Sequence, residues 1–170
     1  PLYHYQPIQV LHVDDDPNIL AITKVFLEHS GQIRVNSCSS VQEAFEYLLR
    51  ESVDVFISDY EMPDMTGIEF LQTIRGHNCD TPFILFTGRG RESVVISAMN
   101  SGATFYVQKG GDPKSQFAEL SDKILKACRQ YRDQQKVRHL SRIFQVLREV
   151  GDAVFGNEDT REVFSRLCTR

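Results

Sequence analysis

The sequence lacks the long apolar segments and paired cysteines that would indicate a membrane protein or a secreted one. No apolar run among its 170 residues approaches the length of about 20 residues that crosses a bilayer, and the N-terminus has no basic-then-apolar signal pattern. Its four cysteines are scattered without a C-x-x-C pair, which is typical of reduced thiols. We therefore expect a cytoplasmic protein with no membrane association. The chain begins with proline rather than methionine, so we also expect a processed or truncated form.

Acidic residues are in excess only in the first part of the chain. Residues 1–120 hold 8 Lys and Arg against 16 Asp and Glu, a balance of −8, whereas residues 121–170 hold 11 against 7, a balance of +4. This asymmetry indicates two parts with different roles. Acids and bases are interspersed in the basic part, which favours a solvated helix face. It also shows no helix-turn-helix pattern, so we predict no nucleic-acid binding by this fragment.

Five short apolar runs alternate with helical patterns, and each helical pattern has a readable start or stop. Several of the runs are continuously apolar, as expected of strands buried on both faces. The order strand–helix, repeated five times, predicts a doubly wound α/β domain with a parallel sheet. Asp16 before Pro17 and Asp112 before Pro113 are predicted N-caps, and Ser40 with Glu43 and Thr66 with Glu69 are predicted capping boxes. The apolar runs are IQVLHV (8–13), IRVNS (33–37), DVFIS (54–58), PFILFT (82–87) and TFYVQ (104–108).

The last helical pattern continues beyond the length that a compact domain needs. No Gly or Pro occurs from residue 114 to residue 150, which predicts an extended C-terminal helix. Its second half carries Val137, Leu140, Phe144 and Leu147 at alternating spacings of three and four, as in a coiled-coil seam. Two alternatives follow: a homodimer through the C-terminal helix, or a helix that packs back on its own domain.

Polar side chains follow four of the five predicted strands. Asp14 and Asp15 follow the first strand, Asp59 follows the third, Thr87 ends the fourth, and Lys109 follows the fifth. In a parallel sheet these positions fall on one edge. Carboxylates suit Mg²⁺, a carboxylate can attack phosphorus, and an ammonium with a hydroxyl can neutralise phosphoryl oxygens. Each group alone has an ordinary interpretation as a cap, a turn or a surface residue; their joint arrangement indicates a site.

The stretch from Ile8 to Tyr131 resembles the receiver domain of two-component response regulators. The matching motifs are VLHVDDDP, DVFISDYEMPDMTGIEFL, PFILFTG and SGATFYVQK. The resemblance implies a flavodoxin-like three-layer sandwich with a five-stranded parallel sheet in the order 2-1-3-4-5. It also implies a signalling phosphoprotein of a phosphorelay, with a histidine kinase as phosphodonor, that catalyses only its own phosphorylation and dephosphorylation. A longer natural protein could include a kinase domain of its own.

The resemblance assigns a role to each acidic residue of the predicted site. Asp59 is the phospho-acceptor and also a metal ligand. Asp15 binds Mg²⁺ directly, Asp14 binds it through water, and the backbone carbonyl of Glu61 completes the protein ligands. Glu61 and Arg89 stand at variable positions beside the phosphoryl group, and we hypothesise that they pair across the mouth of the site and slow hydrolysis.

The resemblance also assigns the phosphoryl contacts and the switch. Lys109 and Thr87 contact the phosphoryl oxygens, while Thr87 and Tyr106 move together and remodel the face formed by the fourth helix, fifth strand and fifth helix. One position departs from the family pattern. The family usually has proline after the lysine, whereas this chain has Gly110 and Gly111. We expect Lys109 still to reach the site, with altered loop geometry.

We divide the chain into a receiver domain (1–131), a helical linker or coiled coil (132–155) and the stub of a following domain (156–170). The partner expected downstream is a sensory, kinase or output domain. Two alternative functions remain at this point. One is a degenerate receiver that acts only through protein contact. The other is an Mg²⁺-dependent phosphatase of the haloacid dehalogenase type, whose aspartate nucleophile follows the first strand and which would leave Asp59 without a role.

Overall fold

The computed structural model describes residues 6–88 and 92–155, with side chains described as far as residue 150. The chain divides into two compact units, Pro1–Tyr131 and Arg132–Arg170. Strands and helices alternate through the first unit, and the last helix, α5 (Pro113–Phe155), contains residues of both units. The predicted stub at 156–170 lies outside the described residues. No helix in the described part of the chain is both long and apolar enough to cross a membrane.

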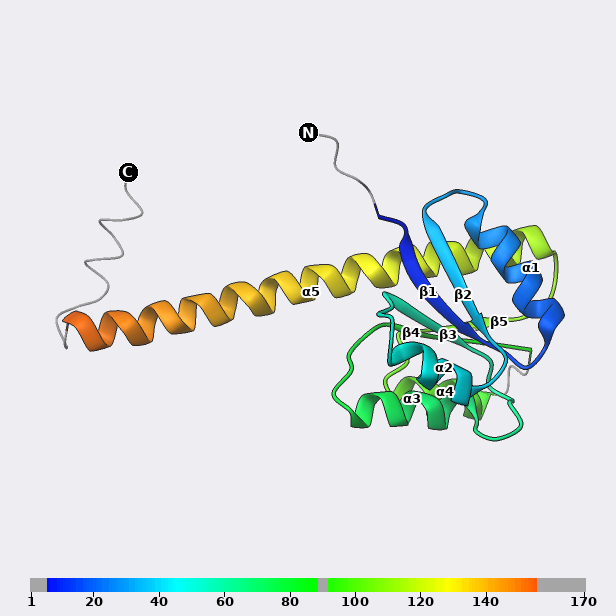
Figure 1. Ribbon diagram of the computed structural model, residues 1–170, viewed down its shortest axis with the longest axis horizontal. Helices are drawn as coiled ribbons and strands as arrows, with labels where there is room; N and C mark the ends of the chain where they lie inside the picture. Colours follow the sequence, from blue (N-terminus) through cyan, green and yellow to red (C-terminus); the bar gives the residue numbers. More distant parts are fainter. Residues whose placement is uncertain (1–5, 89–91, 156–170) are drawn as a thin grey trace. The chain divides into compact units, whose positions relative to one another are not determined.

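The sheet of the first unit is parallel, and its strands lie in the order β2-β1-β3-β4-β5 (Figure 1). This confirms the predicted doubly wound, flavodoxin-like architecture. The predicted apolar runs coincide with the strands to within one residue at each end. The strands are β1 (Ile8–Val13), β2 (Ile33–Cys38), β3 (Val55–Ser58), β4 (Phe83–Thr87) and β5 (Phe105–Gln108).

Helices cover both faces of the sheet. Core residues of α1 and the first part of α5 pack together on one face, and core residues of the other three helices pack on the opposite face (Figure 1). Side chains alternate along each strand, so Val10 of β1 faces the first cluster and Leu11 faces the second. The helices are α1 (Pro17–Glu28), α2 (Val41–Leu48), α3 (Gly67–Gly76) and α4 (Glu92–Asn100), in addition to α5.

The predicted caps start the helices. The Asp16 carboxylate accepts a hydrogen bond from Asn18 N–H at 2.8 Å, so the third aspartate of the acidic triplet caps α1. Thr66 and Glu69 form a complete capping box at α3. Ser40 caps α2, but the Glu43 carboxylate accepts from Ser39 N–H rather than from the cap residue, so that capping box is incomplete. The caps matter for the site because α1 begins two residues after Asp15, and α3 follows the loop that begins at Asp59.

The exposure of the apolar side chains of α5 differs between the two units. In the first unit its apolar stripe is buried on the sheet, with Phe117, Leu120 and Ile124 each no more than 4% exposed. In the second unit the apolar side chains from residue 137 to residue 150 are between 42% and 63% exposed. The stripe with coiled-coil spacing is therefore available for a further contact.

Candidate functional site

Strands β1 and β3 bring two carboxylates to the same level of the sheet. Val13 pairs with Ser58 at the last position of the β1–β3 ladder, and each strand is followed at once by an aspartate. Asp59 N–H donates to the Val13 carbonyl at 2.9 Å, and Asp14 N–H donates to the Cys38 carbonyl at 3.1 Å. These bonds hold the backbone of both aspartates to the neighbouring strand.

Three carboxylates gather at this edge. Oxygens of Asp14, Asp15 and Asp59 all lie within 4.8 Å of one another. Asp14 and Asp59 are buried, with 1% and 8% exposure, whereas Asp15 is exposed. Buried like charges at this distance repel one another unless a cation lies among them. The set consists only of oxygen donors and is open to water on the Asp15 side, which fits a hard cation such as Mg²⁺ that keeps part of its hydration shell.

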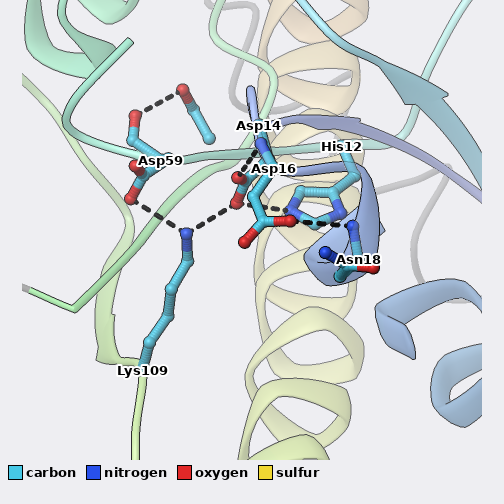
Figure 2. Close-up of polar contacts among 7 residues, drawn as sticks. His12, Asp14, Asp16, Asn18, Asp59 and Lys109 are labelled. Atoms are coloured by element: carbon cyan, nitrogen blue, oxygen red, sulfur yellow. Dashed lines mark hydrogen bonds and ion pairs between the residues drawn. The ribbon is translucent and has the colours of Figure 1, made fainter. Parts of the chain in front are cut away.

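Lys109 supplies positive charge to the two buried carboxylates. Its backbone N–H donates to the Thr87 carbonyl at 2.8 Å, which holds the residue at the end of β5 beside the end of β4. Its ammonium nitrogen lies 2.6 Å from Asp14 Oδ2 and 3.1 Å from Asp59 Oδ1 (Figure 2). Burial would raise the pKa of Asp14, but His12, Lys109 and the N–H of Asp16 together outweigh it, and the pKa of Asp14 is lowered.

The two predicted switch residues lie on neighbouring strands. Thr87 ends β4 and is 2% exposed, and Tyr106 lies on β5 opposite Leu85. Tyr106 is half-buried against the core cluster that includes α3 and α4, and burial raises the pKa of its phenol. Its hydroxyl has no hydrogen-bond partner within the described residues.

The predicted pair of Glu61 and Arg89 lies only partly within the described residues. The Glu61 side chain is exposed, and Arg89 lies outside those residues.

The loop after Lys109 differs from the family's proline loop. Gly110 has φ 128° and Gly111 has φ 84°, angles that glycine adopts easily and that proline cannot adopt. Gly110 N–H donates to Gln116 Oε1 at 2.6 Å. The loop is therefore tied to the first turns of α5, and Lys109 reaches both carboxylates without the proline.

Two residues of the site's surroundings were missed by the sequence reasoning. A Cβ on Gly67 would lie 2.1 Å from the Asp59 carbonyl oxygen, so only glycine lets α3 begin beside the acidic cluster. His12 is fully buried two residues before Asp14, with its Nε2 3.7 Å from Asp14 Oδ2 (Figure 2). The cap at Thr66 predicted the start of α3 but not its closeness to Asp59. For His12, the signal in the sequence was a histidine within the otherwise apolar run at the end of β1.

Comparison with known proteins gives one consistent result. The family model described as "Response regulator receiver domain" matches residues 10–121. Response regulator Rre1 of Synechocystis sp. is 33% identical over 110 residues, which are 64% of this chain and 48% of that protein. Response regulator SaeR of Staphylococcus aureus is 29% identical over 125 residues, 74% of this chain and 54% of that protein. The chain thus spans about half the length of these relatives.

Solved structures of similar fold include the receiver domain of the Francisella response regulator 1452, with a TM-score of 0.66 and 26% identity, over 74% of this chain and 99% of that one. A receiver domain protein from Clostridium thermocellum gives a TM-score of 0.65 and 30% identity, over 74% and 97% of the two chains. A CheY-like receiver domain protein from Methanospirillum hungatei gives a TM-score of 0.64 and 26% identity, over 74% and 99%.

Proposed function

The chain belongs to the response regulator receiver family of two-component signalling, and from that premise we propose that Asp59 accepts a phosphoryl group from a histidine kinase. The observation that carries this proposal is the pairing of the Lys109 ammonium with both buried carboxylates, Asp14 and Asp59. The arrangement places the Asp59 carboxylate beside the Lys109 ammonium and beside the carboxylate oxygens of Asp14 and Asp15. This is what an aspartate nucleophile toward phosphorus requires.

Four residues would hold the metal ion. Asp15, Asp59 and the Glu61 carbonyl would contact Mg²⁺ directly, and Asp14 would contact it through water; the closeness of the three carboxylates supports this set. When bound, Mg²⁺ supplies positive charge to the oxygens of the transferring phosphoryl group. The buried position of Asp14 and Asp59 strengthens any charge interaction made there, because the local dielectric is low.

In the transfer, an Asp59 carboxylate oxygen attacks phosphorus. The P–O bond forms as the P–N bond to the kinase histidine breaks, and the imidazole leaves. The Lys109 ammonium, already 3.1 Å from Asp59 Oδ1, neutralises the charge of the arriving phosphoryl oxygens. The Thr87 hydroxyl also contacts these oxygens. Hydrolysis of the resulting acyl phosphate returns the carboxylate, so the chain catalyses only its own phosphorylation and dephosphorylation.

The switch that we propose follows from the added charge. Thr87 turns toward the phosphoryl group, and the Tyr106 ring moves inward behind it, which remodels the surface of α4, β5 and α5. The half-buried ring of Tyr106, with a hydroxyl that has no hydrogen-bond partner within the described chain, supports a residue with a second position. A new charge that biases a two-state element is a common form of signalling switch.

We propose the same domain organisation that the sequence predicts: a receiver domain over 1–131, a helical linker over 132–155 and the start of a further domain at 156–170. The exposed apolar stripe of α5 would join two copies of the chain, and the further sensory, kinase or output domain would receive the signal. The stripe's coiled-coil spacing and its exposure support the homodimer.

The test is mass spectrometry after incubation with acetyl phosphate and Mg²⁺. We expect a Mg²⁺-dependent gain of about 80 Da, one phosphoryl group, in the wild type and none in Asp59→Asn. Asp64→Asn, on an exposed position of the same β3–α3 loop, is the matched control and should gain the same mass. A wild type that takes up no phosphoryl group would refute the proposal and favour a receiver that acts only through protein contact. Phosphorylation at Asp14 or Asp15 instead would favour the phosphatase type.

A further inference from the structure

His12 is a buried histidine to which the proposed chemistry gives no role. It lies on β1, on the sheet face that Val10 and α5 also occupy, and its side chain is 0% exposed. Its ring centroid lies 6.3 Å from that of Phe86. Neither ring nitrogen has a hydrogen-bond partner within the described residues. A buried polar group without a partner destabilises a fold, so its presence beside the site needs a reason.

The charged groups that act on His12 are Asp14, Lys109 and Asp59, and of these Asp14 forms an ion-pair contact with the ring. A histidine ring carries at least one N–H, at Nδ1 or Nε2, that can serve as a hydrogen-bond donor. Nε2 lies 3.7 Å from Asp14 Oδ2, which is beyond hydrogen-bond distance. A small shift of the carboxylate would close this gap.

The same Asp14 oxygen is bound by Lys109. Oδ2 accepts from the ammonium at 2.6 Å, and this ammonium also lies 3.1 Å from Asp59 Oδ1. A phosphoryl group on Asp59 brings three strong acceptor oxygens that carry about two negative charges in place of the single charge of the carboxylate, and these oxygens compete for the ammonium. As Lys109 turns to these oxygens, Asp14 Oδ2 loses its closest donor while it remains buried.

We propose that His12 is a positioning residue that donates a hydrogen bond from Nε2 to Asp14 Oδ2 when the Lys109 ammonium moves to the phosphoryl group on Asp59. The inference rests on the proposed function. It assigns His12 the smaller effect in the resting protein, where Lys109 already holds Asp14 Oδ2 at 2.6 Å. It assigns a larger effect to the phosphorylated state, in which Oδ2 of Asp14 would otherwise lose the Lys109 donor while Oδ1 keeps the hydrogen bond from Asp16 N–H at 3.1 Å.

Nuclear magnetic resonance of the histidine rings tests this directly. The full chain, labelled with ¹⁵N, would be titrated with beryllofluoride, which mimics a phosphoryl group on a carboxylate, in the presence of Mg²⁺. We expect the His12 ring to carry a proton at Nε2, and we expect a downfield shift of that proton when beryllofluoride binds. A ring protonated at Nδ1, or an unmoved Nε2 proton in the bound state, would overturn the inference. The His12→Gln spectrum assigns the signal by its loss.

Two variants separate hydrogen bonding from packing. His12→Val removes the donor and places a β-branched residue that suits a buried strand, and His12→Gln restores an N–H donor at a similar reach. For His12→Val we expect beryllofluoride affinity to fall about tenfold, as for the loss of a hydrogen bond to a charged group, with resting Mg²⁺ affinity unchanged. His12→Gln should recover most of the loss. Equal losses in both variants, or no loss in either, would overturn the inference.

The wild type and Asp59→Asn distinguish a failure of the proposed phosphorylation from a failure of the proposed role of His12. If the wild type binds no beryllofluoride and takes up no phosphoryl group, the proposed function fails and the inference with it. If the wild type binds beryllofluoride, Asp59→Asn does not, and the His12 signal stays unmoved, only the role of His12 is refuted.

Discussion

The Lys109 ammonium lies 2.6 Å from Asp14 Oδ2, although the two residues are 95 positions apart in the chain. Asp14 is 1% exposed and the Lys109 side chain is 15% exposed, so this ion pair is largely removed from water. A buried carboxylate that loses its cation keeps its desolvation cost without compensation. The pair therefore bears on both the stability of the fold and the chemistry of the site.

Replacing Lys109 with methionine should remove the cation and leave the side-chain volume nearly unchanged. We expect the free energy of unfolding at pH 7 to fall by about 3 kcal/mol, because Asp14 and Asp59 would remain buried with no ammonium between them. Urea unfolding measures the change. Lys114→Met, at an exposed position in the first turn of α5, should leave the unfolding midpoint unchanged. An equal loss in both variants would contradict the assignment.

The lowered pKa of Asp14 predicts an acid-sensitive contribution to stability. A carboxyl whose pKa is lower in the folded state stabilises the fold above its unfolded pKa, here near the ordinary value of 3.8, and this contribution is lost as pH falls through the folded pKa. Urea midpoints between pH 6 and pH 2 should show the wild type more stable than Asp14→Asn at the upper end and the two converging below about pH 4. A difference that stays constant with pH would show that the ion pair does not stabilise the fold.

Gly67→Ala should disturb the site from the start of α3. The added Cβ would lie 2.1 Å from the Asp59 carbonyl oxygen, so the backbone of the phospho-acceptor or of α3 has to move. We expect a loss of about 1–3 kcal/mol in unfolding free energy and slower phosphorylation by acetyl phosphate. Gly76→Ala, at the other end of α3, meets no atom within 4 Å and should be neutral or slightly stabilising. Similar behaviour of the two variants would refute the steric argument.

Installing the family's usual proline at position 110 should impair this protein. The Gly110 φ of 128° is outside the range of proline, and its N–H donates to Gln116. We expect Gly110→Pro to lower both the unfolding midpoint and the phosphorylation rate. Gly110→Ala, where the added Cβ meets no atom within 4 Å, should show the smaller effect of backbone strain alone. A proline variant that equals the wild type would show that the loop geometry is not required.

The exposed stripe of α5 predicts self-association. Phe144 is 62% exposed and Leu147 is 49% exposed, and burying them against a second copy is favourable. Sedimentation should show the average mass rising toward that of a dimer at micromolar or higher concentration, because the apolar gain has to exceed the cost of association. Phe144→Asp should abolish the rise, and Gln134→Asp, at an exposed position beside the stripe, should not. A monomer at all concentrations would leave the stripe to another partner.

Much of the architecture was readable because each strand is a local pattern. The run IQVLHV coincides with β1, and Asp16 caps α1 as its position before Pro17 predicts. The gathering of Asp14, Asp59 and Lys109 was also predictable, since the carboxyl ends of parallel strands meet at one edge. The prediction of a full capping box at Ser40 was wrong in detail, because Glu43 turns to the N–H of the preceding residue.

The sequence by itself determined where the strands begin and end, which helices are capped, and which polar groups follow the strands. These depend on alternation and spacing within short segments. Only the tertiary structure decided that Lys109 bridges Asp14 and Asp59, that Gly67 lies against the Asp59 backbone, and that His12 is buried 3.7 Å from Asp14. The reason is physical: distances and burial in the site arise from strands β1, β3 and β5, whose contacts join residues far apart in the chain.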